Sequence, residues 1–524
     1  MPGSARSVQT LLTAAEAYPA LERAFLAAQT EIWGSFLVFD LSTKLRSPQA
    51  RAIGRTWFDL VIHTLNRHVA ITIVHSDVDP IARAAMHRAA TRHMRMFCAA
   101  AALANPGTRL TITRALHPAR TGPLIRLAIW PYIMKKLWRT AGWLNALSPE
   151  NRTAAIRDMD GAMANFITRP DGRVFPRLWS LPQLHPVTHH QKLAVFDRQL
   201  LYIGGLDLDE RRYDTPQHRR TADQTWHDVQ LLIQGPAVAE AQTHLETFQS
   251  VITGDLPPAK TRRFLRTLSQ PQTGLLHFGP QPLLNELQSA HLALTQRAKR
   301  LIYLESQYFR DLTFARALAI AARRNPDLQL ILILPAAPDD IAFDRKRGLD
   351  ARFGEAMQAR ALRIIRRAFR TRLFVASPAQ PRFAPTDPAL PDGSDNAEDR
   401  RDTLHSAPLV YVHAKVSIFD DAAAIVSSAN LNGRSFRWDT EAGICLANPN
   451  DVVELRHRVM AHWLPADPAP AAFAPDTALA IWRKTAHQNA RRPATQRQGF
   501  LLPHDFAAAE AFGRKLPIIP EEMV

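Results

Sequence analysis

The sequence predicts an α/β protein built from two similar domains. The pattern His-x-Lys-x4-Asp occurs once in each half of the chain, as His190–Asp197 and as His413–Asp420. Both copies are followed by a pair of small residues and then a short polar side chain, in Gly204–Asp207 and in Ser427–Asn430. A chain of 524 residues also exceeds the length that one hydrophobic core usually supports. We therefore expect a duplicated domain.

The predicted elements repeat in the same way. Leu21–Asp40 has the pattern of a helix running into a strand, and Leu287–Asp311 has the same pattern. Each is followed by another helix and by a strand of apolar residues, within His68–Pro80 in the first half and Asp327–Asp340 in the second. Strands that alternate with helices predict, in each domain, a mostly parallel sheet flanked by helices.

A Pro-containing stretch, Gly254–Arg262, is typical of a linker between the two domains. We place an N-terminal domain at residues 1–256 and a C-terminal domain at 257–465. Residues 466–524 are rich in Ala and Pro and carry a basic stretch, and we expect them to form a C-terminal extension.

Two segments depart from the repeated pattern, the first as an insert in the N-terminal half and the second as an irregular stretch before the second motif. Leu124–Leu147 is apolar and aromatic with interspersed cations. It is either an element that settles among lipid headgroups or a pair of helices, broken at Pro131, that packs on the core. Ser377–Ser406 is rich in Pro, Asp and Arg, and a loop of this length either gates a site or is disordered.

Composition constrains the partner. The formal net charge of +17 favours a polyanion, either a phospholipid surface or nucleic acid, but no DNA- or RNA-reading motif is present. Cys98 and Cys445 alone argue against a disulfide framework. We find no signal peptide and no membrane-spanning run. We expect a cytoplasmic or peripheral membrane protein, with secretion by a route without a classical signal as the alternative.

The duplicated pattern suits cleavage of a phosphodiester. On a strand, residues i and i+2 face the same way, so each motif presents one imidazole and one ammonium to the same spot. Two motifs together supply two imidazoles, which can divide the roles of nucleophile and general acid. Two lysines can neutralise the phosphoryl oxygens. This chemistry needs no metal ion and no other cofactor.

With their flanks, the two motifs resemble the phospholipase D superfamily. Four further blocks resemble those of true phospholipases D, in the same order: Gly204–His218, Thr225–Val238, Tyr303–Phe309 and Ser427–Glu441. The resemblance implies two phospholipase D-like domains related by a pseudo-twofold axis, with the active site at their interface. A non-catalytic scaffold is disfavoured because no motif His or Lys is lost.

The resemblance also implies roles at the reacting phosphate. His190 is expected to be the nucleophile that forms a phosphohistidine. His413 is expected to protonate the departing alcohol and then to activate water. Lys192 and Lys415 are expected to hold the phosphate oxygens, together with Asn430 and Ser428.

Carboxylates are expected to orient the histidines, Asp228 for His190 and Glu441 for His413. The aspartates that complete the two catalytic motifs, Asp197 and Asp420, are expected to bind backbone or lysine beside the site.

Other positions are more ambiguous. Asp207 stands where many members have Asn, which puts phosphate contact there in doubt. His189 and His185 are expected to pack or to lie at the surface. Tyr213, Asp214 and His218 shape a headgroup pocket or belong only to a loop.

The predicted activity is that of a phospholipase D. It would hydrolyse a glycerophospholipid, with phosphatidylcholine as the expected substrate, to phosphatidate and free headgroup, or transfer the phosphatidyl group to an alcohol. The alternatives are a cardiolipin synthase-like phosphatidyltransferase and a phosphodiesterase acting on nucleic acid. We expect a monomer that meets its substrate at a phospholipid membrane surface, with no nucleic-acid partner.

Overall fold

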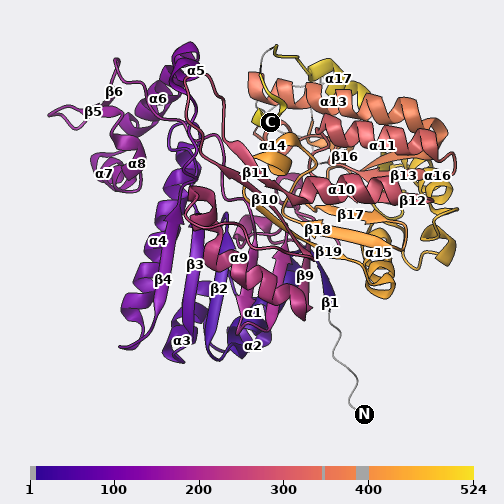
Figure 1. Ribbon diagram of the computed structural model, residues 1–524, viewed down its shortest axis with the longest axis horizontal. Coiled ribbons are helices and arrows are strands. Elements are labelled where there is room, and N and C mark those ends of the chain that lie inside the picture. The colour runs from indigo at the N-terminus through magenta and orange to yellow at the C-terminus, as the bar shows by residue number, and fades with distance from the viewer. Residues whose placement is uncertain (1–7, 345–347, 385–400, 518) are drawn as a thin grey trace.

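The computed structural model describes residues 8–344, 348–384, 401–517 and 519–524. The N-terminal half, indigo to magenta in Figure 1, contains a seven-stranded sheet in the order β1-β9-β8-β7-β2-β3-β4. Its strands are β1 (Val8–Leu12), β2 (Glu31–Phe36), β3 (Ala70–Ser76), β4 (Leu110–Ala115), β7 (Leu193–Phe196), β8 (Leu200–Gly204) and β9 (Val229–Gln234).

The C-terminal half contains a nine-stranded sheet in the order β11-β10-β19-β18-β17-β12-β13-β14-β20. Its strands are β10 (Phe264–Gln270), β11 (Gln281–Asn285), β12 (Leu301–Glu305), β13 (Gln329–Ile333), β14 (Leu373–Pro378), β17 (Val416–Phe419), β18 (Ala423–Ser427), β19 (Glu441–Leu446) and β20 (Leu501–Pro503). Without its two edge strands, this sheet has the same order as the first. The predicted duplication therefore extends to the whole topology of each sheet.

The expectation of mostly parallel sheets was wrong. Parallel pairing is confined to β2-β3-β4 and to β12-β13-β14. All other neighbours within the two sheets pair antiparallel, including the motif strands with their successors, β7 with β8 and β17 with β18. The reason is the short turn after each motif, since strands joined by a few residues can pair only as an antiparallel hairpin.

Three hydrophobic clusters hold the layers together. In the first domain, α1 (Thr13–Ala27), α3 (Trp57–Asn66) and α4 (Ala84–Leu103) cover one face of the sheet. In the second, α10 (Glu286–Arg297), α11 (Leu312–Arg324) and α13 (Leu349–Phe369) do the same. The other faces share one core with α9 (Pro236–Thr253), α15 (Pro449–Trp463) and α16 (Ala478–Arg491). The two domains are thus packed through a common interior.

The expected insert forms a small lobe with its own core, seen at the upper left of Figure 1. Its helices do break near Pro131, as α5 (Pro123–Ala128) and α6 (Trp130–Asn145). The lobe also contains α7 (Pro149–Arg157), α8 (Asp160–Met163), β5 (Phe166–Thr168) and β6 (Val174–Pro176). One face of α6 is buried, but Trp138 is 48% and Trp179 100% exposed. The expectation of helices packed on a core therefore holds for the buried face of α6. Several aromatic side chains of the insert are nevertheless exposed to solvent.

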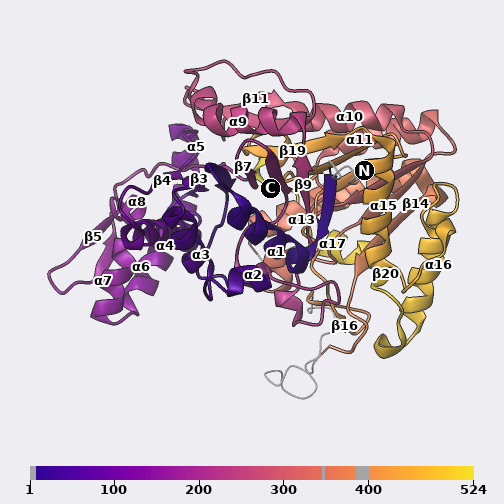
Figure 2. The ribbon, with the colours of Figure 1, turned by 90° about the horizontal axis from the view of Figure 1, so that it is seen from below.

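Residues 466–524 do not form a separate extension. They add β20 to the edge of the second sheet, place α16 against its core and pack α17 (Phe506–Phe512) against α13. The basic side chains of this stretch hid its apolar face, which includes the fully buried Trp482. In Figure 2 β20 and α16 lie along one side of the second domain.

The long loop expected at Ser377–Ser406 lies partly outside the described residues, because 385–400 are not described. Its second flank carries a short two-stranded ribbon of β15 (Thr403–Leu404) and β16 (Ala407–Pro408). The remaining short helices are α2 (Pro48–Arg51), α12 (Asp339–Ala342) and α14 (Gly433–Arg437). Within the described residues, no helix combines the length and apolar character needed to cross a membrane.

Candidate active site

The two motifs meet at the domain interface. Each His-x-Lys pair lies in an extended segment just before its strand, since β7 begins at Leu193 and β17 at Val416. These segments pair with the opposite domain: the His190 backbone N donates to the Thr440 carbonyl at 2.8 Å, and the His413 N to the His227 carbonyl at 2.8 Å. Each motif segment is therefore held in place by backbone hydrogen bonds to the other domain.

Each motif histidine is held by a carboxylate from the other domain. His190 Nδ1 lies 3.0 and 3.1 Å from the two Glu441 carboxylate oxygens, and His413 Nδ1 lies 2.6 Å from Asp228 Oδ2. The expected assignment of Asp228 to His190 and of Glu441 to His413 was therefore wrong. Asp228 immediately precedes β9 and Glu441 begins β19, and at both places the chain forms an isolated bridge with the motif segment of the other domain. Both histidines keep their Nε2 atoms for a substrate.

Two buried lysines complete the constellation. Lys192 Nζ donates to the His190 carbonyl at 2.5 Å, and Lys415 Nζ lies 2.9 Å from His413 Nδ1 and also donates to the His413 carbonyl. Burial lowers the pKa of Lys415 to about 7, against the opposing effect of Asp228. Burial lowers the pKa of Lys192 as well, against the effect of Asp207. A buried ammonium is a strong anion ligand because little water competes for it.

The field around His413 is positive. Burial, then Lys415, Arg212 and Lys192, lower the pKa of His413 well below its ordinary value. Burial raises the pKa of its partner Asp228 to about 6, with Lys415 acting in the opposite sense. The His413 imidazole is therefore neutral at neutral pH until an anion enters. A phosphodiester would offset the positive charge and let His413 accept a proton.

Asp207 is compensated by a residue that the sequence reasoning missed. Its carboxylate accepts from the Val38 backbone N at 2.9 Å, contacts the Arg212 guanidinium and lies 3.5 Å from Lys192 Nζ. Burial raises the pKa of Asp207, but Lys192 and Arg212 outweigh that effect and lower it overall. The signal was available, because an acid in a position usually held by a neutral amide calls for a nearby cation.

After the second motif, the position that corresponds to Asp207 is an asparagine, Asn430. Asn430 is buried, and its Oδ1 has no hydrogen-bond partner within the described residues. Such an amide is available for a ligand. Ser428, in contrast, is already engaged: its hydroxyl donates to Glu441 at 2.5 Å and accepts from the Ala442 N at 3.1 Å. Ser428 therefore orients the carboxylate that holds His190.

The motif aspartates lie at the far ends of the strands. Asp197 accepts from the backbone N atoms of Gln29, Thr30 and Glu31 at 2.8 to 3.0 Å. Asp420 does the same for Lys299, Arg300 and Leu301 at 2.8 to 2.9 Å. Both aspartates fix the start of the neighbouring strand, β2 or β12. Their expected binding of backbone is confirmed, but they lie at the far ends of the motif strands and not beside the site with the catalytic groups.

Two of the ambiguous positions resolve as packing. His189 is buried and bonds the Thr440 hydroxyl at 2.8 Å, and His185 bonds the His117 carbonyl at 3.0 Å. Trp226, which sequence reasoning did not single out, packs its ring 4.5 Å from that of His413. It therefore supports the imidazole that Asp228 orients.

The block around Tyr213 divides between two environments. Tyr213 stacks on Arg46 at 3.6 Å, whereas Asp214 and His218 are fully buried and bond each other at 2.6 Å.

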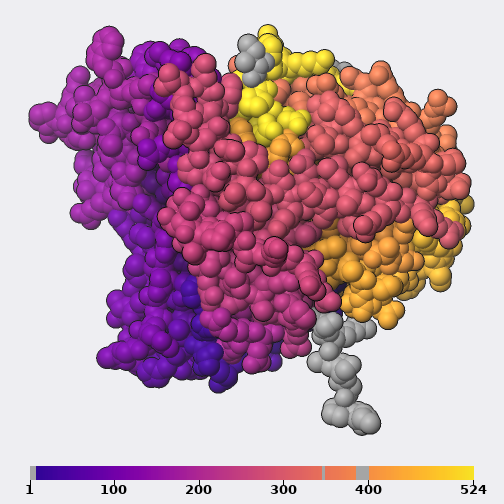
Figure 3. Space-filling model, in the orientation of Figure 1, coloured from indigo at the N-terminus to yellow at the C-terminus, as the bar shows by residue number. Residues whose placement is uncertain are grey.

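The C-terminal residues, yellow at the upper surface in Figure 3, also pack near the first motif. Met523 contacts Val187 and Trp438.

Comparisons with known proteins found matches in sequence and in structure. Residues 292–463 match a family model described as the cardiolipin synthase, PLD-like domain. The cardiolipin synthase of Listeria welshimeri is 24% identical over 257 residues, 48% of this chain and 43% of that protein. Phospholipase D alpha 2 of Oryza sativa is also 24% identical, over 50% of this chain and 45% of that protein.

The chain spans less than half the length of these relatives, and 24% of phospholipase D1 of Schizosaccharomyces pombe, to which it is 23% identical. Among solved structures, phosphatidylserine synthase of Haemophilus influenzae aligns over 93% of this chain and 94% of its own, with 13% identity and a TM-score of 0.45.

Fold, motifs and relatives define a two-domain α/β protein with one composite His-Lys site. Residues 292–463 match a phospholipase D-like domain, and about half of the chain is similar to proteins named as phospholipases D and cardiolipin synthases, which supports the phospholipase D superfamily. Members of this class include phosphodiesterases and phosphatidyltransferases, as the names of the relatives show.

Proposed function

We propose that this protein is a phospholipase D that cleaves glycerophospholipids, with phosphatidylcholine as the first substrate to test. One observation carries the proposal: two imidazoles, each held at Nδ1 by a carboxylate of the other domain, share a buried site with Lys192 and Lys415. Two oriented imidazoles and two ammonium groups are what a two-step displacement at phosphorus requires.

In the proposed first step, His190 Nε2 attacks phosphorus and the bond to the headgroup oxygen breaks. His413 gives its Nε2 proton to that oxygen, and Glu441 stabilises the positive charge on the His190 ring. In the second step, His413 removes a proton from water or from an alcohol, whose oxygen attacks the phosphohistidine and releases phosphatidate or a transferred phosphatidyl group. Lys192, Lys415 and Asn430 neutralise the phosphoryl oxygens throughout.

The substrate is proposed to reside in a membrane surface. The net charge of +17 favours anionic lipid, and the exposed aromatic side chains of the insert lie beside exposed cations such as Lys135 and Arg139. We accordingly propose a peripheral membrane enzyme that works as a monomer, because both motifs of the site lie in one chain.

A second candidate is a cardiolipin synthase-like phosphatidyltransferase. The matched family model and the Listeria relative favour it. It would use the same phosphohistidine, with the hydroxyl of a second lipid as acceptor in place of water.

One experiment separates these candidates. Purified protein is incubated with phosphatidylcholine vesicles containing a little ethanol, and in parallel with phosphatidylglycerol vesicles, and products are identified by mass spectrometry. Phosphatidate and phosphatidylethanol support the phospholipase D, whereas cardiolipin from phosphatidylglycerol alone supports the synthase. The His190→Ala and His413→Ala variants must form neither. Cleavage of single-stranded DNA without any lipid product would refute both.

Trapping the intermediate tests the assignment of the nucleophile. Wild type and both single variants are mixed with radiolabelled substrate and quenched rapidly. Label is expected in wild type and, at a low rate, in His413→Ala, but not in His190→Ala. The opposite pattern would make His413 the nucleophile.

A further inference from the structure

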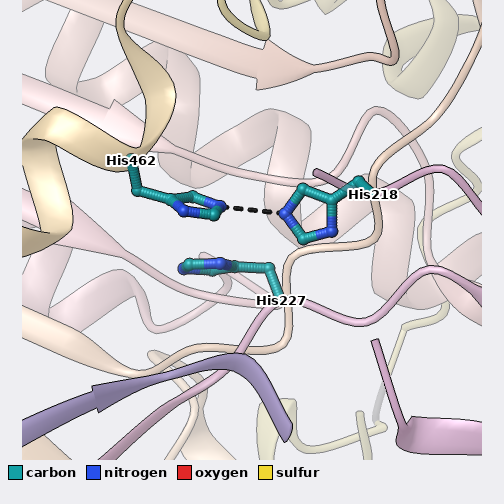
Figure 4. A group of neighbouring side chains, drawn as sticks. All are labelled: His218, His227 and His462. Atoms are coloured by element: carbon teal, nitrogen blue, oxygen red, sulfur yellow. Dashed lines mark hydrogen bonds between the residues drawn. The ribbon is translucent and has the colours of Figure 1, made fainter. Parts of the chain in front are cut away.

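A cluster of three histidines lies behind the site and plays no part in the reaction proposed above. His218 and His227 come from the N-terminal domain and His462 from the end of α15, and one ring nitrogen of each lies within 4.8 Å of the others. Figure 4 shows the His218 and His462 rings meeting edge to edge above the His227 ring. The His218 Nε2 and His462 Nε2 atoms are 2.9 Å apart. At most one of these two nitrogens carries a proton, because two N–H groups would otherwise face each other.

Two carboxylates fix which nitrogens are free. Asp214 Oδ2 lies 2.6 Å from His218 Nδ1, so that nitrogen carries the donated proton and Nε2 keeps its lone pair. Glu305 Oε2 lies 3.1 Å from His227 Nε2 and fixes the other ring in the same way. His227 Nδ1 is then left as an acceptor, and it is buried without a hydrogen-bond partner within the described residues. Carboxylate–histidine pairs of this kind form the outer shell of many metal sites.

The charge balance points in the same direction. Asp214 and Glu305 are both fully buried, and in the described part of the chain their ion-pair partners are histidines, not lysine or arginine. Two buried carboxylates need positive charge close by. A divalent cation bound by one nitrogen of each imidazole, with the His462 proton carried on Nδ1, would supply it.

We propose that His218, His227 and His462 bind a divalent transition metal, with zinc as the first ion to test. Three imidazoles with a carboxylate or water as fourth ligand form a common zinc set. Binding would widen the 2.9 Å separation of the two Nε2 atoms toward roughly 3.3 Å and rotate the His227 ring, given zinc–nitrogen distances of about 2.0–2.1 Å.

The position of the site gives the metal a structural role. The ion would link α15 of the second domain to the segment of the first domain that carries His227. The neighbouring residue is Asp228, and the His227 carbonyl accepts the His413 backbone N. The metal therefore fastens the domain interface next to the carboxylate that orients His413, without touching the substrate.

The test measures metal content. The full chain is stripped with a chelator, incubated with zinc, passed over a desalting column and analysed by mass spectrometry for metals. About one zinc per chain is expected in the wild type, and none in His462→Gln. The matched control is His244→Gln, since His244 is a buried histidine that bonds Gln191 outside the cluster; it should bind zinc like the wild type.

Two further readouts keep the result clear if a variant folds poorly. Cobalt bound to the wild type should give the absorption of a tetrahedral complex, and zinc should raise the unfolding temperature of wild type but not of His462→Gln. A wild type that retains no stoichiometric metal overturns the proposal. So does a folded His462→Gln that binds as much zinc as the wild type, because the ion would then sit elsewhere.

Discussion

At the scale of single residues, the site depends on contacts that cross the domain interface. The crossed pairs, His190 with Glu441 and His413 with Asp228, replace the pairs within each domain that the motif order suggested. Each imidazole therefore gains its orientation only when the two domains are docked.

A double-mutant cycle tests the crossed pairing. His190→Ala combined with Glu441→Gln should show an interaction energy of roughly 0.5–3 kcal/mol in the free energy of unfolding, because the two side chains are in contact. His190→Ala combined with Asp228→Asn, the matched control pair, should be additive to within about 0.5 kcal/mol. Urea unfolding of the three single variants, the two double variants and the wild type gives both values. Coupling only in the control pair would restore the uncrossed arrangement.

Arg212 is predicted to keep Asp207 from capturing Lys192. In Arg212→Gln the Asp207 carboxylate, now without its guanidinium, should draw Lys192 away from the phosphate and lower kcat by roughly 10²-fold. Adding Asp207→Asn should restore much of the activity, because the neutral amide leaves Lys192 free. Steady-state kinetics with a soluble short-chain phosphodiester measures the rescue. A double variant no better than Arg212→Gln would show that Arg212 acts on the substrate directly.

Lys415 is predicted to make the reaction pH-dependent. Its pKa, lowered by burial to about 7, means that the free enzyme loses this cation as pH rises through neutrality. Accordingly, kcat/KM should fall from neutral to alkaline pH, and binding of inorganic phosphate at pH 7.5 should take up a proton. Calorimetry in buffers of different ionisation enthalpy measures that uptake, and Lys415→Met should reduce it, leaving only the part due to His413. A kcat/KM that stays constant into the alkaline range would contradict the prediction.

At the scale of elements, each motif strand is anchored at its far end. Asp420 caps the start of β12 through three backbone N–H groups, and Asp197 does so for β2. Both aspartates sit in the left-handed region, at φ of 53° and 50°, where the chain turns from the motif strand into the next strand.

Asp420→Ala is therefore predicted to destabilise without disabling the chemistry. Loss of a charged acceptor at partly solvated N–H groups should cost about 1–2 kcal/mol. Thermal unfolding measures the loss, and kcat per folded molecule should stay near that of the wild type. Asp197→Ala serves as the equivalent variant in the other domain. A folded Asp420→Ala with normal stability and a large loss in kcat would return this residue to the catalytic groups.

At the scale of the whole molecule, the insert gives the first domain a lobe that the second lacks. This lobe buries one face of α6 and exposes Trp138 and Trp179, beside the cations of a strongly basic chain. Such a surface suits a lipid headgroup layer more than bulk water.

Vesicle binding tests this surface. Trp138→Ala with Trp179→Ala should weaken binding to anionic vesicles about tenfold or more, because each indole would lose its burial in the headgroup layer. The matched control is Leu103→Ala, 67% exposed at the end of α4 away from the lobe. Co-sedimentation with vesicles at two salt concentrations provides the measurement. Equal binding of the double variant and the wild type would remove the insert from the membrane contact.

The sequence by itself determined the chemistry and its duplication. The residues of both motifs, their flanks and the repeating helix–strand units are local patterns, because covalent order alone fixes their spacing. It also allowed the insert helices, broken at Pro131, to be predicted. The direction of the sheets was missed because the segments after each motif were taken as motif flanks and not as strands.

Only the tertiary structure decided which carboxylate holds which histidine, that Arg212 balances Asp207, and that His462 joins His218 and His227. The histidine–carboxylate pairs and the contact of His462 with His218 join residues of different domains, whereas Arg212 and Asp207 lie five positions apart but pair beside the buried Lys192. Their energies depend on burial and on distances of a few ångströms, which arise only when the two sheets pack around a shared core. The sequence thus specified the reacting groups, and the docking of the two domains specified their partners.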